Sequence, residues 1–115
     1  MNKSTKKFTS INNGWSATAG DIEVGVYGVN GSIFEPRIYW TDGKKTFSCD
    51  AEIAGDPYTK NSGYYAFFPS ADKWRWERPH QAGELSEADK KAILADLKAG
   101  LSAMGQKLYL DYLKK

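Results

Sequence analysis

The sequence predicts an α+β domain in which an antiparallel β-sheet, a meander, is followed by a C-terminal helix packed on one face. Two observations carry this prediction. In Ile22–Tyr27 and again in Phe47–Ile53, apolar and polar residues alternate, which is typical of strands with one buried face. From Ser86 to Gly105 the apolar residues recur at helical spacing instead. A chain of 115 residues closes one hydrophobic core, so we expect a single domain over residues 1–115, with residues 1–7 as a flexible tail.

Turn signals divide the first two thirds of the chain into short strands. Asn13-Gly14 and Asp42-Gly43 favour tight hairpins. The glycines at 28–31 indicate another turn, and 55–63 has the composition of a loop. The sheet is expected to hold five to seven strands, drawn from Phe8–Asn12, Trp15–Thr18, Ile22–Tyr27, Ile33–Trp40, Phe47–Ile53, Tyr64–Phe68 and Lys73–Arg78.

The helix has start and stop signals at both ends. Ser86 and Asp89 fit a capping box, in which each side chain accepts a hydrogen bond from the backbone of the other. Gly105 stands where a left-handed C-terminal cap is wanted. Gly100, inside the helix, costs about 1 kcal/mol relative to Ala, which a close approach to the sheet would explain. The segment Leu108–Leu113 is expected to form a short second helix or a docked tail.

The predicted core lies between the helix and the sheet. The apolar stripe of the helix is Ile93, Leu94, Leu97, Leu101 and Met104. It is expected to face the sheet residues Val24, Ile38, Phe47, Trp74 and Trp76.

Composition excludes several classes of function. Hydrophobic residues make up 41% of the chain and charged residues 26%, as in ordinary globular proteins. A net charge of +2 is too small to suggest nucleic acid or an anionic membrane as a partner. One cysteine allows no intrachain disulfide, and no apolar run reaches the roughly 20 residues of a membrane-spanning helix. No secretory signal opens the chain, so we expect a cytoplasmic protein.

The residues that carry chemistry are few. Cys49 falls on the inward side of its strand, so a buried packing role is expected, and His80 is expected to be an exposed loop residue. A Cys49–His80 dyad stays open as an enzyme hypothesis, as does an acid pair such as Glu84 with Glu87 or Asp50 with Glu52. One His and one Cys do not make a zinc site, and no calcium or phosphate loop is present. The sequence therefore predicts no catalytic residues, no metal and no cofactor.

The aromatic and basic stretch Lys73–Arg78 supports an alternative function. Aromatic rings interleaved with Arg and Lys can stack bases or sugars while the cations hold phosphates, which would make a small nucleic-acid or carbohydrate binding module. However, Trp74 and Trp76 fall on one face of the strand and Arg75 on the other. This separation favours a core face and a surface face, so nucleic acid is the less favoured partner.

A family resemblance points to a protein partner. A β-meander, a strand ending Trp76-Glu77-Arg78-Pro79, and the Ser-capped helix beginning Leu85-Ser86-Glu87-Ala88-Asp89 resemble the immunity protein 74 family, small immunity proteins of bacterial polymorphic-toxin systems. The resemblance implies a cytoplasmic, non-catalytic protein that binds and blocks a cognate toxin. It implies no particular contact residues. Strand alternation supplies candidates on the face opposite the core: Tyr27, Tyr39, Tyr65, Arg75 and Glu77.

Overall fold

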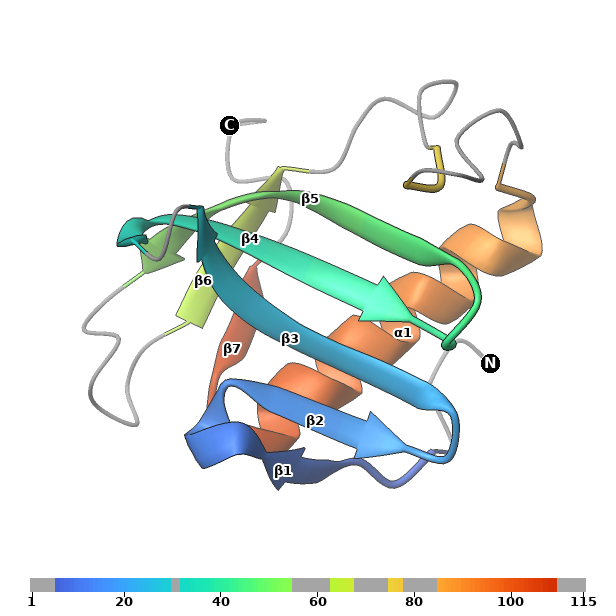
Figure 1. Ribbon diagram of the computed structural model, residues 1–115, viewed down its shortest axis with the longest axis horizontal. Coiled ribbons are helices and arrows are strands. Elements are labelled where there is room, and N and C mark those ends of the chain that lie inside the picture. The colour runs from blue at the N-terminus through green and yellow to red at the C-terminus, as the bar shows by residue number, and fades with distance from the viewer. Residues whose placement is uncertain (1–5, 30–31, 55–62, 68–74, 78–84, 110–115) are drawn as a thin grey trace.

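The fold is a seven-stranded sheet curled over one long helix (Figure 1). The structure, a computed structural model, describes residues 6–29, 32–54, 63–67, 75–77 and 85–109. The elements are β1 (Thr9–Ile11), the 3-10 turn η1 (Asn12–Gly14), β2 (Ser16–Ala19), β3 (Ile22–Val29), β4 (Ser32–Thr41), β5 (Thr46–Ala54), β6 (Gly63–Phe67), α1 (Glu87–Ala103) and β7 (Lys107–Tyr109). The predicted α+β class, with an antiparallel meander and a C-terminal helix, is confirmed.

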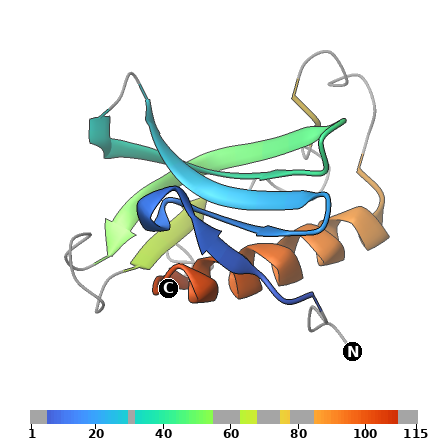
Figure 2. The ribbon, with the colours of Figure 1, turned by 60° about the horizontal axis from the view of Figure 1, so that its bottom comes forward.

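The strands lie in the sheet in chain order. Each strand from β1 to β5 pairs antiparallel with the next one, as a meander requires. The last pair, β6 with β7, is parallel because the chain passes through α1 between them. In Figure 2 the sheet lies on one side of α1 and its margins bend toward the helix, so one sheet surface faces the helix and the other faces away.

The C-terminal segment was predicted to form a second helix or a docked tail. Its described part, residues 108–109, belongs to β7, a strand docked on β6, so the helix alternative is wrong. Gly105, with φ of +79°, ends the turn after α1 in a left-handed conformation that suits glycine. The chain then pairs with the edge of β6, whose backbone N–H and C=O groups need partners. Gly63 makes the pairing possible, because a Cβ there would lie 2.4 Å from the Lys107 carbonyl oxygen. Residues 110–113 lie outside the described residues.

Two other sequence predictions need correction. Lys73–Arg78 was expected as a full strand, but in its described part, 75–77, only Arg75 makes a β-bridge. The Glu77 N–H donates to the Thr46 carbonyl at 2.7 Å, so this segment lies beside the end of β5 that β6 does not reach. Trp76 is buried as predicted, while Trp74 lies outside the described residues. The turn expected at 28–31 begins later, because β3 continues to Val29.

The helix and its core agree with the sequence. Ser86 and Asp89 form the predicted capping box, with distances of 3.0 and 3.1 Å between the backbone nitrogens and the side-chain oxygens. Gly100 permits the predicted close approach, because a Cβ there would lie 2.0 Å from Val24 Cγ2. Ile93, Leu97 and Leu101 are fully buried in one cluster with Val24, Ile38 and Phe47, and Leu94 and Met104 pack against it.

A buried carboxylate was not anticipated. Asp96 lies on the sheet-facing side of α1 and is 1% exposed. Its carboxylate accepts a hydrogen bond from Trp40 Nε1 at 2.9 Å and forms an ion pair with Lys6 Nζ at 3.1 Å. Lys6 belongs to the segment expected to be a flexible tail, yet here it binds the core helix. Within the described part of the chain, no helix has the length and apolar character needed to cross a membrane.

Candidate functional site

The sheet surface turned away from α1 is the candidate site, and we call it the outer face. In Figure 2 it is the side of the sheet that faces away from α1. Strand alternation places its side chains opposite the core residues. In an antiparallel sheet with one covered surface, the other surface is usually polar. This one is both charged and aromatic. Its charged and aromatic members with described side chains, together with Ser48, are Glu23, Tyr27, Glu35, Arg37, Tyr39, Ser48, Asp50, Glu52, Tyr65, Phe67, Arg75, Glu77, Lys107 and Tyr109.

Tyr39 anchors the β3 side of the outer face. Its ring lies across Gly25, where a Cβ would come within 2.8 Å of the ring. Its hydroxyl donates to the Glu23 carboxylate and shares a 3.0 Å hydrogen bond with the Ser16 hydroxyl. Burial, and next the hydrogen bond to Glu23, raise the pKa of Tyr39 to about 12. Tyr39 is therefore a fixed, half-buried support rather than a freely exposed ring.

Arg37 lies at the centre of the outer face, held from several sides. Its Nη1 donates to Asp50 and its Nη2 donates to Ser48 Oγ at 3.0 Å. Ser48 Oγ in turn donates to the Glu77 carboxylate. Burial lowers the pKa of Arg37, but the hydrogen bond with Tyr27 and the charge of Asp50 raise it by more, so the guanidinium stays charged.

Tyrosine pairs flank this polar centre. Tyr27 lies opposite Arg37 in the strand register, and its ring centroid is 6.0 Å from that of Tyr39. On the other side Tyr65 and Tyr109 have centroids 5.0 Å apart. Tyr27 and Tyr109 are exposed large hydrophobic side chains, at 42% and 38%.

The five sequence candidates are all on this surface, but they do not behave alike. Tyr27, Arg75 and Glu77 are exposed, whereas Tyr39 and Tyr65 are half-buried. From the sequence, Asp50 was named only in an acid pair with Glu52, and Arg37 and Ser48 were not singled out, although alternation on β4 and β5 marks all three as outward. Tyr109 was not singled out either, because a second helix or a docked tail was expected there.

Among the described residues, no arrangement of side chains supports the catalytic alternatives. Cys49 is 3% exposed on the helix side of the sheet, and burial raises the pKa of its thiol to about 12, so the thiol is protonated at neutral pH. His80 and Glu84 lie outside the described residues. Asp50 is occupied with Arg37, and Glu87 pairs with Lys90 at 3.2 Å. No three His, Cys, Asp or Glu side chains gather as metal ligands within the described ranges.

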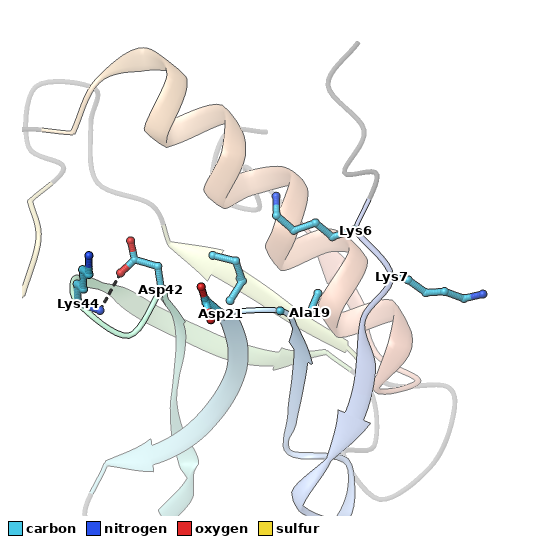
Figure 3. A pocket seen from close by; sticks show the side chains of 8 residues that line it. Lys6, Lys7, Ala19, Asp21, Asp42 and Lys44 are labelled. Atoms are coloured by element: carbon cyan, nitrogen blue, oxygen red, sulfur yellow. Dashed lines mark hydrogen bonds between the residues drawn. The ribbon is translucent and has the colours of Figure 1, made fainter.

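A depression of about 620 Å³ lies at one end of the sheet, beside the N-terminal segment (Figure 3). It is lined by Lys6, Lys7, Ala19, Gly20, Asp21, Ile22, Asp42 and Lys44. Several of its charged groups already serve the fold. Lys6 pairs with Asp96, and Asp42 accepts backbone hydrogen bonds from Lys44 and Lys45 at 2.9 and 2.8 Å. Lys7 points away from the depression in Figure 3. The outer face is therefore the stronger candidate.

Comparison of the chain with protein-family models, with curated proteins and with solved structures gave no match.

Proposed function

We propose that this protein is a non-catalytic inhibitor that binds a cognate toxin protein through the outer face. The observation that supports this most directly is the fixed array of Tyr27, Arg37 and Asp50 at the centre of that face. Tyr and Arg are enriched among the residues that dominate binding energy in protein interfaces. Side chains that are already held in place lose less conformational entropy when a partner binds.

The scaffold has the properties that such an inhibitor needs. Tyr39 is clamped by Glu23 and Ser16, and Arg37 by Asp50 and Ser48, so the face keeps one shape. The molecule measures 37 × 31 × 31 Å. One face of that size accommodates the roughly 800 Å² per partner that a stable protein complex buries.

The proposal places the inhibitor and its toxin in the cytoplasm. A single cysteine with a protonated, buried thiol suits a reducing compartment. The resemblance to small immunity proteins, carried by Trp76-Glu77-Arg78-Pro79 and the Ser86 cap, is in keeping with this location.

The burial of Trp76 argues against the binding-module alternative. A stacking platform needs exposed rings. Trp76 is 5% exposed and packs on Trp40, with centroids 5.8 Å apart. This ring is therefore part of the core, and we do not adopt the alternative.

The test combines capture with neutralisation. The tagged protein is used to capture partners from the producing organism, and a candidate toxin is then purified and mixed with it. We expect a one-to-one complex and rescue of growth when the two are expressed together. The Tyr27→Ala and Arg37→Ala double variant should weaken the complex by about 2 kcal/mol or more.

Lys98→Ala is the control. Lys98 is exposed like Tyr27, but it lies on α1, which covers the opposite surface of the sheet. A complex that the double variant leaves as tight as wild type, although its thermal unfolding shows it is folded, would overturn the outer-face assignment. A partner whose toxicity is not relieved would overturn the inhibitor function.

A further inference from the structure

We infer that the partner inserts a cationic side chain, Arg or Lys, between Glu52 and the Tyr65–Tyr109 pair of the outer face. This inference rests on the proposed function, because it names the chemistry of the surface that the toxin presents. It is carried by three observations: the charge of the outer face, the way Arg37 is held, and the repetition of that arrangement on β5, β6 and β7.

Among the residues with described side chains, the charge of the outer face is opposite to that of the chain as a whole. The chain carries a net charge of +2. On the outer face, among the residues with described side chains, carboxylates outnumber the cations, which are Arg37, Arg75 and Lys107. The Asp50 side chain stays 74% exposed despite its ion pair with Arg37, so much of its charge still faces outward. A cationic partner surface is therefore electrostatically complementary to this face, whereas an anionic surface would be repelled by it.

Arg37 shows how this face binds a cation. Its guanidinium lies on the outer face with Tyr27 opposite it in the register and with its Nη1 on the Asp50 carboxylate. The Asp50 carboxylate gives the guanidinium a charge-assisted hydrogen bond, and Tyr27 gives it a further hydrogen bond. A cation can also lie over the face of an aromatic ring, as Lys45 Nζ does at 5.4 Å from the centre of the Trp76 ring.

The same combination recurs one strand further along. Glu52 lies opposite Tyr65 in the register of β5 and β6, and Tyr65 lies opposite Tyr109 in the register of β6 and β7. Directly opposite residues of an antiparallel pair, such as Glu52 and Tyr65, have Cβ atoms roughly 5 Å apart. The Tyr65 and Tyr109 ring centroids are 5.0 Å apart, so the carboxylate and both rings are within reach of one guanidinium. Glu52 and Tyr109 are both exposed. The described cation on β7 is Lys107, which is exposed and lies two positions before Tyr109.

The experiment uses a short oligo-arginine peptide as the probe and nuclear magnetic resonance of the full chain as the readout. We expect amide shifts to concentrate on β5, β6 and β7, and the affinity to fall at least about tenfold between roughly 50 mM and 500 mM salt. Glu52→Gln and Tyr109→Ala should each weaken the peptide about fivefold or more. Asp21→Asn, which removes the same charge from an exposed turn away from the outer face, should leave the affinity unchanged.

The outcomes separate this inference from the proposed function. Shifts centred on α1 or on the depression beside Asp21, or equal weakening by Glu52→Gln and Asp21→Asn, would overturn the cation site. So would an oligo-glutamate peptide or a single-stranded oligonucleotide that shifts β5 to β7 in place of oligo-arginine. If the peptide maps as expected but no toxin is neutralised, the proposed function fails while the cation site stands. If the captured toxin depends on Tyr27 and Arg37 but not on Glu52, only the cation site fails.

Discussion

Trp40 and Asp96 are joined by a 2.9 Å hydrogen bond between the indole Nε1 and the carboxylate Oδ2, across the interface between β4 and α1. The same carboxylate holds Lys6, whose side chain is 41% exposed, so a buried and an accessible group share one acceptor. This contact fixes the helix to the sheet at one register. It also ties the N-terminal segment to the core.

Asp96→Ala should destabilise the fold. It leaves the buried Trp40 N–H without its Asp96 acceptor and removes the ion pair with Lys6, and an unsatisfied buried donor costs about 1–3 kcal/mol. Asp96→Asn should cost less, because the amide oxygen still accepts from Trp40. Urea unfolding measures both variants. A loss below about 0.5 kcal/mol for Asp96→Ala would mean that this contact does not hold the helix.

Leu97→Ala tests the placement of the helix stripe. Leu97 is 0% exposed between α1 and the sheet, and emptying such a site typically costs about 2–5 kcal/mol. Lys98→Ala, on an exposed neighbour, serves as the control and should stay within about 0.5 kcal/mol. Denaturant unfolding gives both values, and a Leu97→Ala cost as small as that of the control would show the stripe is misplaced.

Gly100→Ala should lower stability although Ala is the better helix former by about 1 kcal/mol. The added Cβ would sit 2.0 Å from Val24 Cγ2, so α1 must move away from β3, and such overpacking costs about 1–3 kcal/mol. Val24→Ala removes the obstructing methyl groups. In that background Gly100→Ala should become neutral or stabilising, and a double-mutant cycle measures the coupling. Additive effects would contradict the contact.

Tyr39→Phe should cost about 1 kcal/mol, because it removes the hydroxyl that binds Glu23 and Ser16. The variant also has a pH signature. Burial and the hydrogen bond to Glu23 raise the pKa of Tyr39 from 10.0 to about 12 in the folded state. Folding therefore favours the neutral phenol. Its contribution to the free energy of unfolding is fully present below pH 10 and is lost as the pH rises toward 12.

The free energy of unfolding, measured for wild type and Tyr39→Phe across this alkaline range, tests that signature. The difference between the two proteins should shrink as the pH rises, since the lysine titrations affect both alike. A difference that stays constant with pH would show that the Tyr39 hydroxyl titrates as freely as in the unfolded chain.

The Cys49 thiol should resist alkylation in the folded protein. It is 3% exposed, and burial raises its pKa to about 12, so almost no thiolate exists at neutral or mildly alkaline pH. Iodoacetamide labelling followed by mass spectrometry should be slow in native buffer and fast in urea. Rapid labelling without urea would reopen the hypothesis of a reactive Cys49.

Local patterns determined much of this architecture. The capping pair Ser86 and Asp89 and the stripe at Ile93, Leu97 and Leu101 specify α1, because capping and helical periodicity depend only on neighbours a few residues apart. The alternation around Cys49 likewise specifies β5 and the side of the sheet that is buried. The fold class and most of the core therefore follow from the sequence itself.

Long-range contacts decided the rest. The sequence gives Leu108 and Tyr109 no cue for a strand; they become β7 because the edge of β6 offers unpaired backbone groups, and Gly63 leaves room for them. From the sequence, Asp96 is expected to be an ordinary polar helix residue. Its burial depends on Trp40 and Lys6, which are far away in the chain and bind its carboxylate in the folded structure. The outer face depends on strand register in the same way. Alternation alone points Tyr39 and Arg37 outward, but only the pairing of β3, β4 and β5 brings Glu23, Ser48 and Asp50 to them, because hydrogen bonds between strands fix which side chains are neighbours.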